Sequence, residues 1–163
     1  MIDITEVIIN EGKVMDCETE LGLTHLVYKF GKFKIAKSSP VSVRIENVEG
    51  KKLVLNVAAT LDIKIPCGRC LKPVGERLDI QFELETDLNE REYIDGYNLD
   101  VDQLVHDEAL LVWPESVLCR EDCKGLCSTC GQNLNDGSCD CERTDLDPRM
   151  AKILDIFSNF KEV

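Results

Sequence analysis

Eight of the nine cysteines of this chain fall into four closely spaced pairs, and this spacing constrains the fold more than any other feature of the sequence. The pairs are Cys67/Cys70, Cys119/Cys123, Cys127/Cys130 and Cys139/Cys141, and Cys17 stands apart. A two-residue spacing lets one tight turn present two sulfurs to one tetrahedral metal ion. Glycine in or after such a turn tolerates positive φ and lets backbone N–H groups approach the thiolates. Eight sulfurs are enough for two metal sites with four cysteine ligands each.

Loop geometry favours one division of the four pairs. The third and fourth pairs are joined by a short segment rich in turn residues, so they can close on one another. The first and second pairs then form a long-range site, because the entropy of closing a loop grows only with the logarithm of its length. The single residue between Cys139 and Cys141 is the least typical spacing, and either of these two thiols could be a spare.

Zinc is the metal we expect, in two structural sites. The chain begins without the features of a secretory signal, and no apolar run reaches the roughly 18 residues of a membrane-spanning helix. A cytoplasmic location follows as an expectation, and cysteine clusters in a reducing compartment hold metals more often than they form disulfides. Spacing does not separate zinc from iron, and a redox thiol pair is a further alternative. For Cys17 we expect a small buried side chain or a spectator.

Antiparallel β structure is predicted before the first cysteine pair and after it. Alternating apolar residues mark strands at 41–45, 53–57, 63–65 and 78–84. Residues 1–10 predict another strand, and residues 21–35 predict one or two more. At 163 residues the chain fits one globular domain or two small sub-domains, and such a length buries enough surface for a core without help from the cysteines.

Two helices are predicted in the C-terminal half. Asp100 and Gln103 resemble a capping box, and the apolar positions from Val101 to Val112 share one helical face. Asp147-Pro148 predicts a second helix start. Its apolar stripe consists of Met150, Ile153, Leu154, Phe157 and Phe160.

The expected fold class is α+β, an antiparallel β-sheet or partly open barrel with two short helices and a zinc-knuckle C-terminal region. Residues 1–86 form a β platform that carries the Cys67/Cys70 knuckle, and residues 87–99 form an acidic connection. Residues 100–163 hold a helix, a cysteine-rich region like a zinc ribbon, and a C-terminal helix. The polar stretch 86–100 with Gly96 predicts an exposed segment.

The net charge of −12 is unevenly distributed. Residues 1–75 hold 11 Lys and Arg against 9 Asp and Glu, whereas residues 76–163 hold 8 against 22. Two zinc-loaded tetrathiolate sites would take the total to about −16, because eight thiolates outweigh two dications. Indiscriminate phosphate binding by the whole surface is therefore disfavoured, and the acidic half suits a basic protein partner.

A basic segment interrupts this pattern near the N-terminus. Lys29, Lys32, Lys34 and Lys37 alternate with phenylalanines. The favoured interpretation is an edge strand whose lysines face water and discourage aggregation. The alternative is an auxiliary contact with rRNA, in which the lysines meet phosphates and the rings stack on bases.

Catalysis is not indicated by any motif of the sequence. His25 and His106 lie in different segments, and each is expected to be a surface or core residue. The sequence lacks a phosphate-cradling glycine loop, a nucleophile elbow and a histidine-containing metal signature. A closed tetrathiolate site also lacks the open coordination position that metal catalysis uses. We therefore expect a protein that is not an enzyme.

Several of these motifs together resemble the YceD family. They are Cys67-Gly68-Arg69-Cys70-Leu71, the run from Leu110 to Pro114, the run from Cys123 to Asn135, Cys139-Asp140-Cys141 and Asp147-Pro148-Arg149-Met150. Members of that family are described as large-subunit ribosomal RNA accumulation proteins. The resemblance implies a bacterial ribosome-biogenesis factor that supports accumulation or processing of 23S rRNA.

The uneven distribution of charge along the chain indicates what kind of partner such a factor binds. An acidic surface held by zinc suits a factor that binds a basic large-subunit ribosomal protein or a pre-50S particle and releases it when rRNA competes. The alternative function is a thiol-redox or metal-sensing regulator that uses the Cys-x-x-Cys pairs. A zinc-stabilised interaction module unrelated to ribosomes is a third interpretation.

Overall fold

A computed structural model describes residues 1–29, 31–49, 52–87 and 92–141 of the chain. The elements in chain order are β1 (Ile2–Asp3), α1 (Thr5–Ile9), β2 (Val14–Thr19), β3 (His25–Tyr28), β4 (Gly31–Ser38), β5 (Val41–Glu49), β6 (Lys52–Pro66), β7 (Pro73–Asp87), β8 (Ile94–Asp95), β9 (Asn98–Leu99) and α2 (Val101–Leu111). All strand pairs in this part of the chain are antiparallel.

The long strand β6 organises the main sheet. It pairs with β7 along its whole length on one side, and on the other with β5 along its first half and β4 along its second. Strands β2 and β3 extend the sheet beyond β5 and β4. The side chains of β6 alternate strictly, so that its odd-numbered apolar residues from Leu53 to Ile65 are buried. Burying one face of a pleated strand in this way fixes the register.

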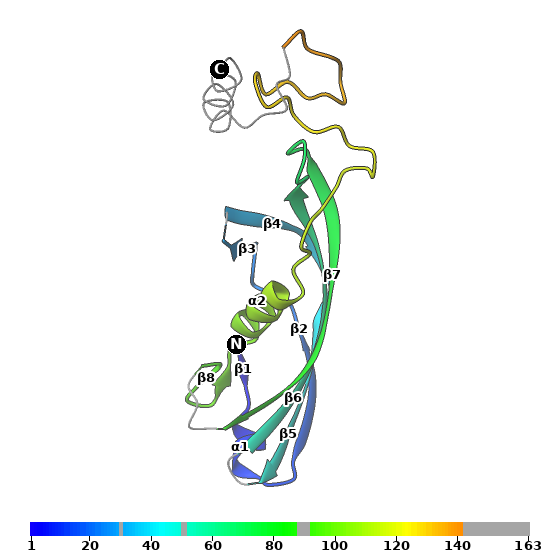
Figure 1. Ribbon diagram of the computed structural model, residues 1–163. Coiled ribbons are helices and arrows are strands. Elements are labelled where there is room, and N and C mark those ends of the chain that lie inside the picture. Colours follow the sequence, from blue (N-terminus) through cyan, green and yellow to red (C-terminus); the bar gives the residue numbers. More distant parts are fainter. Residues whose placement is uncertain (30, 50–51, 88–91, 142–163) are drawn as a thin grey trace, which may run out of the picture.

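The sheet is elongated and curved, and its concave face carries α2 (Figure 1). Helix α2 buries Leu104, Val105 and Ala109 against the core. Its start follows the prediction, because the Asp100 side chain accepts a hydrogen bond from the Gln103 N–H at 3.1 Å. The helix ends at Leu111, three residues before Pro114. The predicted 101–112 helix is therefore confirmed to within one residue.

The strands predicted within residues 41–84 are confirmed, and 53–57 and 63–65 are parts of the single strand β6. Residues 21–35 contribute two strands, β3 and β4. The sheet is open rather than a barrel, since no pairing joins β2 to β7 in the described ranges. Strand β2 was not predicted. The helix expected from Asp147 lies outside the described residues.

The strand predicted for residues 1–10 is wrong beyond Asp3. Residues Thr5–Ile9 form the helix α1, because Ile4 and Val7 are buried at helical rather than alternating spacing. The Asp3 carboxylate accepts a hydrogen bond from the Thr5 N–H at 2.9 Å and turns the chain into the helix. The buried Asn47 side chain donates to the Val7 carbonyl at 2.8 Å and holds α1 against β5.

The exposed segment predicted for residues 86–100 is wrong at both of its ends. Thr86 belongs to β7 and is buried. Ile94 and Leu99 pair across the β8–β9 hairpin and are also buried. Leu99 pairs in turn with Ile2 of β1. This second, small sheet needs β1 from the N-terminus of the chain as the partner of β9. The polarity of residues 86–100 alone does not predict such a pairing.

Candidate metal centres

The first cysteine group joins the end of the sheet to the segment after α2. Cys67 and Cys70 lie in the turn between β6 and β7, and Cys119 and Cys123 come from the later segment. The Gly68 N–H donates to the Val117 carbonyl at 2.8 Å, and the Leu126 N–H donates to the Arg69 carbonyl at 3.1 Å. Backbone hydrogen bonds therefore bring the two segments together alongside the sulfurs.

The spacing of the sulfurs suits a tetrahedral ion. All four Sγ atoms lie within 4.8 Å of one another. The Cys67 and Cys123 sulfurs are 3.8 Å apart, and those of Cys70 and Cys119 are 3.5 Å apart. A zinc ion with Zn–S bonds of about 2.3 Å would separate its ligand sulfurs by about 3.8 Å. None of the thiols is in a disulfide, so the donors are available.

The turns around Cys67 and Cys127 have the same hydrogen-bond pattern. In the first turn the Leu71 N–H donates to the Cys67 carbonyl at 2.9 Å. In the second turn the Gly131 N–H donates to the Cys127 carbonyl, also at 2.9 Å. Both residues have positive φ, 60° at Leu71 and 74° at Gly131. The glycine predicted after such a turn is present in the second knuckle, whereas the first places a leucine in the left-handed region.

Backbone donors favour thiolates at the first cysteine of each turn. The N–H groups of Cys70 and Arg69 lower the pKa of Cys67 to about 6, with burial opposing the shift. The N–H groups of Cys130 and Thr129 likewise lower the pKa of Cys127 to about 6. These donors stabilise the charged form of the sulfur.

Other thiols in each group hold their protons. Hydrogen bonding to Cys70, reinforced by burial, raises the pKa of Cys119 to about 12. Hydrogen bonding to Cys130 and burial raise the pKa of Cys141 to about 12. Four sulfurs this close cannot all ionise unless a cation compensates them, which is the behaviour of a metal-binding donor set.

Arg69 and Gly125 hold the two chain segments of the first group close together. The Arg69 guanidinium donates to the Cys123 carbonyl at 2.9 Å, and so fixes the segment that carries this cysteine. Gly125 has φ +77°, and a Cβ there would lie 3.1 Å from the Arg69 carbonyl oxygen. Any other residue would meet both backbone strain and a close contact at this position.

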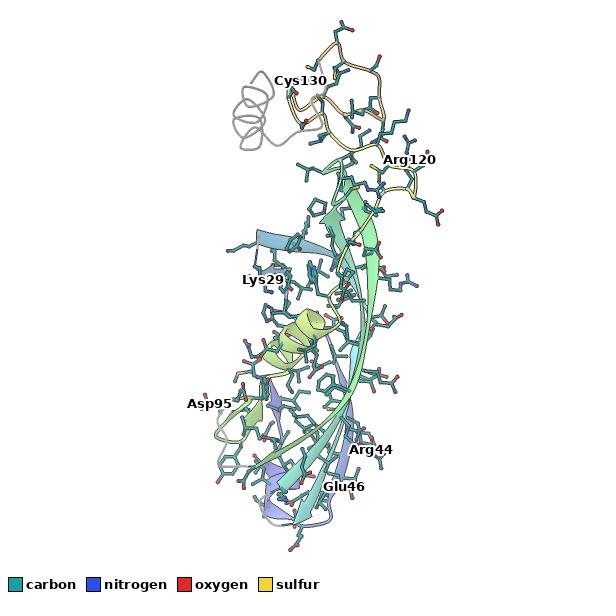
Figure 2. All side chains as sticks on the ribbon, in the orientation of Figure 1. Lys29, Arg44, Glu46, Asp95, Arg120 and Cys130 are labelled. Carbon is teal, nitrogen blue, oxygen red and sulfur yellow. The ribbon has the colours of Figure 1, made fainter. Side chains whose placement is uncertain are left out.

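The second group comprises Cys127, Cys130, Cys139 and Cys141, whose sulfurs also lie within 4.8 Å of one another. The structure thus collects the eight thiols into the two groups that loop geometry favoured. Cys139 and Cys141 both belong to the second group, so neither is set apart as a spare. Arg120 and Cys130 mark the end of the molecule at which both groups lie (Figure 2).

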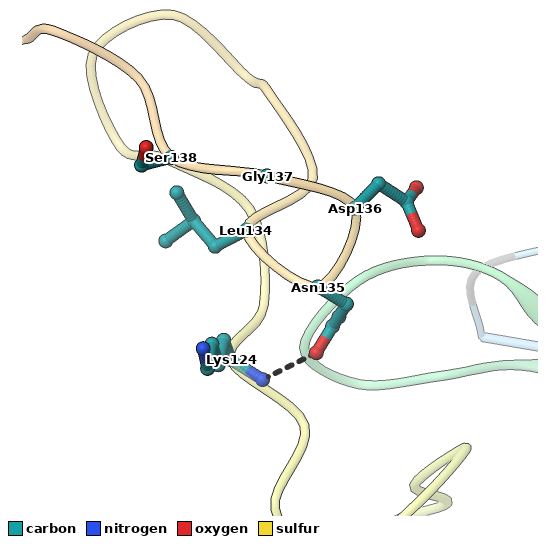
Figure 3. Close-up of a pocket in the computed structure, with 6 residues that line it drawn as sticks. All are labelled: Lys124, Leu134, Asn135, Asp136, Gly137 and Ser138. Carbon is teal, nitrogen blue, oxygen red and sulfur yellow. Dashed lines mark hydrogen bonds between the residues drawn. The ribbon is translucent and has the colours of Figure 1, made fainter.

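Asn135 connects the two groups. It belongs to the loop between Cys130 and Cys139, and its Nδ2 donates to the Cys123 sulfur of the first group at 3.3 Å. Its Oδ1 accepts from the Lys124 N–H at 2.8 Å and from the Arg120 guanidinium at 2.7 Å. This loop and Lys124 line a polar pocket of about 640 Å³, and the hydrogen bond from Lys124 to Asn135 joins two of the lining residues (Figure 3).

Each group offers four thiols and no histidine or carboxylate. Cys67, Cys70, Cys123 and Cys127 are buried, while Cys119 and Cys130 are exposed. A tetrahedral ion bound by all four sulfurs would have no position left for a substrate. The chemistry that this arrangement supports is therefore cross-linking of chain segments.

The other predicted candidates lie apart from the cysteine groups. Cys17 is half-buried on β2, and burial raises the pKa of its thiol. His25 is exposed, and its Nδ1 lies 2.9 Å from the Thr24 hydroxyl. The His106 ring links α2 to β3, because its Nε2 accepts from the Val27 N–H at 3.4 Å while its Nδ1 contacts Asp107 at 2.9 Å.

Arg69 and Asn135 were not predicted as parts of the site. Arg69 stands inside a Cys-x-x-Cys pair, and its position was the only sequence signal for a role near the sulfurs. Asn135 lies 12 residues from Cys123, in a stretch whose polar residues are typical of any turn. Their roles depend on contacts between segments, which the sequence pattern does not show.

A family model described as large ribosomal RNA subunit accumulation protein YceD matches residues 55–157. This range begins in β6 and includes both cysteine groups. The chain belongs to the YceD family. The resemblance in the cysteine and Trp-Pro motifs is thereby confirmed as family membership.

The individual relatives are less than 30% identical to this chain. An uncharacterized protein of Mycobacterium bovis and one of Mycobacterium tuberculosis are each 28% identical over 127 residues, covering 71% of this chain and 60% of theirs. A chloroplastic YceD homologue of Arabidopsis thaliana, named a large ribosomal RNA subunit accumulation protein, is 26% identical over 147 residues, covering 67% of this chain and 46% of that protein. The chain thus spans about half to three fifths of the length of these relatives. No solved structure gives a significant match.

None of the helices in the described part of this YceD chain is both long and apolar enough to cross a bilayer.

Proposed function

We propose that this chain is a cytoplasmic, non-catalytic factor that supports accumulation of large-subunit rRNA. The observation that carries the proposal is the family match, which extends over β6, β7, α2 and both cysteine groups. The family description and the name of the plant relative both refer to accumulation of this RNA. A closed donor set without a substrate position agrees with a binding role rather than a reaction.

We further propose that the eight grouped cysteines hold two structural zinc ions. Support comes from the sulfur spacing and from the N–H donors aimed at Cys67 and Cys127. Bound zinc would supply positive charge that lets all four thiols of a group ionise. Cys67 and Cys70 would then tie the sheet to the segment that carries Cys119 and Cys123, which leaves the acidic C-terminal part in a fixed place.

The partner we propose is a basic large-subunit ribosomal protein, free or within a pre-50S particle. On β7 the outward positions Asp79, Glu83 and Glu85 are exposed carboxylates along one strand. Exposed acids such as Glu121 and Asp122 continue the negative charge at the cysteine end. Such a surface attracts a basic protein and speeds the encounter, and rRNA with its higher charge density can later displace the factor.

Depletion of the factor in cells tests the role. We expect the ratio of large- to small-subunit rRNA to fall and to recover when the wild-type chain is restored. An unchanged ratio would refute the proposed function. The same cells can be complemented with the double variant Asp79→Asn/Glu83→Gln on β7, and with Asp16→Asn/Glu18→Gln on β2 as a control of equal charge change at the opposite edge.

Affinity capture from nuclease-treated lysate tests the partner. We expect a basic large-subunit protein to stay bound after the RNA is removed, and to be lost with the β7 variant but not with the β2 control. Disappearance of every ribosomal partner with the RNA would show that the protein-mediated version is wrong.

A thiol-redox or metal-sensing regulator has less support. Cys67 and Cys123 are almost fully buried, at 0% and 3% exposure, so oxidants have little access to them. Titration of free thiols with and without a chelator separates the two functions. A structural site exposes its thiols only when the metal is removed, whereas a redox pair cycles without metal.

A further inference from the structure

Lysines on β4 project from the face of the sheet that is turned away from α2. The side chains of this strand alternate, with Phe33 half-buried and Ile35 buried, while Lys32 and Lys34 are exposed. Lys29 does not join them, because its Nζ lies over the Tyr28 ring, 5.6 Å from the centroid, beside Trp113. The predicted group of four lysines is therefore divided by the fold.

Strand register adds two basic residues that are distant in sequence. The β4–β6 pairing begins at Ile35↔Ile63, and Lys34 and Lys64 each lie next to one residue of this pair. After the irregularity in β4, Lys37 pairs with Asp62, which in turn pairs with Arg77 of β7. Neighbouring strands lie about 4.8 Å apart, so Lys37, Asp62 and Arg77 lie side by side across β4, β6 and β7, and Lys32 and Lys34 continue the basic charge along β4. We call Lys32, Lys34, Lys37, Lys64 and Arg77 the basic convex patch.

Basic residues outnumber acidic ones in this patch. Its four lysines have no ion pair with any residue that the structure describes, while the acids at the patch are Asp62, held by Arg77 at 3.0 Å, Glu76 in the same pocket, and Asp79 beside Arg77. By contrast Lys13, Lys52 and Lys72 all pair with carboxylates elsewhere. In a chain of net charge −12, such a patch has the character of an anion-binding surface.

Two pockets lie at the surface of the patch. A pocket of about 420 Å³ is lined by Ala36, Lys64, Gly75 and Arg77, together with Asp62, Ile63 and Glu76. A second pocket of about 380 Å³ shares Asp62 and Arg77 with it and contains Lys37. A Cβ at Gly75 would meet nothing within 4 Å, so the space beside this residue is open. A chain of phosphates can therefore approach the sheet between basic side chains.

We propose that the basic convex patch binds the phosphodiester backbone of RNA. This inference deepens the proposed function and rests on it, since that function brings the chain to rRNA. RNA is favoured over an acidic protein because neither pocket is lined by an aromatic side chain, and protein interfaces depend on such anchors. For the same reason binding is independent of base sequence, since neither pocket offers a ring on which bases could stack.

Fluorescence anisotropy with a labelled single-stranded RNA, measured over a range of salt concentrations, tests the patch. The variant is Lys34→Gln/Lys64→Gln in the full metal-loaded chain. The matched control is Lys29→Gln/Lys124→Gln, which removes the same charge from two exposed lysines outside the patch. Loss of two phosphate contacts should lower the magnitude of the slope of log K against log[salt] by about 1.4 on single-stranded RNA. We expect at least a tenfold loss of affinity for the patch variant and an unchanged slope for the control.

Three results would overturn the inference. One is equal slopes for the patch variant and the control. Another is binding of poly-glutamate as tight as that of RNA, which would assign the surface to an acidic protein. The third is failure of the wild-type chain to bind RNA at low salt, and the rRNA ratio in depleted cells then still decides the proposed function separately. Circular dichroism and metal content confirm that each variant is folded.

Discussion

Asn135 is the residue through which one cysteine group supports the other. Its Nδ2 donates to the Cys123 sulfur at 3.3 Å, while its Oδ1 accepts from Lys124 and Arg120. The variant Asn135→Asp keeps the shape and the acceptors but replaces the donor by a carboxylate oxygen. We expect the affinity of the first group for zinc to fall by about 10- to 100-fold, as for other outer-shell partners of metal ligands. Competition with a chromogenic chelator measures this.

The matched control is Gln132→Ala in the same loop, where the Gln132 side chain donates to the Ser138 carbonyl at 3.2 Å and to no other group of the described residues. Zinc release from the first group should be unchanged in this control. Equal release from both variants would show that Asn135 does not stabilise the Cys123 thiolate.

Leu71 and Gly131 occupy equivalent positions in the two knuckles, and opposite substitutions should have opposite effects. Leu71 has φ 60° and is 62% exposed, so Leu71→Gly removes backbone strain with little loss of packing. The left-handed conformation costs a residue with a side chain about 1–2 kcal/mol. We expect the free energy of unfolding to rise by up to about 1 kcal/mol in Leu71→Gly and to fall by about 1 kcal/mol in Gly131→Ala.

Denaturant unfolding of the zinc-loaded chain measures both changes. Gly125→Ala provides a comparison, because its Cβ would also contact the Arg69 carbonyl and its loss of stability should exceed that of Gly131→Ala. Destabilisation by Leu71→Gly comparable to that by Gly131→Ala would contradict the strain at Leu71.

The two cysteine groups could be predicted from sequence because cysteine pairs are local signals. Both knuckle turns and the division into two groups follow from spacing and loop length. Arg69 and Asn135 could not be predicted, since each acts on atoms of a segment that only the fold brings near. The left-handed leucine at position 71 was equally unforeseen, because the rule for such turns favours glycine there.

At the level of elements, the sheet and the cysteine region have separate sources of stability. The apolar core is built from the strands, α1 and α2, together with Val117, and contains none of the paired cysteines. Removal of zinc should therefore leave the β-sheet folded and release the segment around Cys119 and Cys123. In hydrogen exchange we expect the Gly68 and Leu126 amides to lose protection, because they bond across the first group. The Leu55 and Val57 amides, inside β6, serve as the control.

Global loss of protection on chelation, with β6 included, would contradict this separation. It would mean that the metal stabilises the whole domain.

Element prediction succeeded where periodicity was strong and failed where pairing was distant. β5, β6 and β7 alternate over long runs, and α2 has a cap and a stop signal. Residues 1–10 and 86–100 contain no long alternating run of apolar residues. Ile2 and Ile94 each pair with Leu99, so these short strands depend on strand pairing and not on a local pattern. Tertiary pairing of this kind overrides local composition.

At the scale of the whole molecule, the first cysteine group should matter more than the second. It links the sheet to the rest of the chain, whereas the second closes within residues 127–141. We expect both Cys67→Ser/Cys70→Ser and Cys139→Ser/Cys141→Ser to reduce the zinc content from two ions to one. Only the first variant should fail to restore the rRNA ratio in depleted cells.

Equal restoration by both cysteine variants would show that attachment of the sheet to the C-terminal segment is not required. The zinc content of each variant keeps the result interpretable, because it reports which group has been lost.

The most direct measurement is the metal content and thiol state of the freshly purified native chain. Elemental analysis together with native mass spectrometry, under conditions that preserve bound metal, gives both. Two zinc ions per chain, with no pair of cysteines oxidised, is the predicted result. A folded chain that contains no metal, or one whose paired cysteines are linked by disulfides in the cell, would contradict the account.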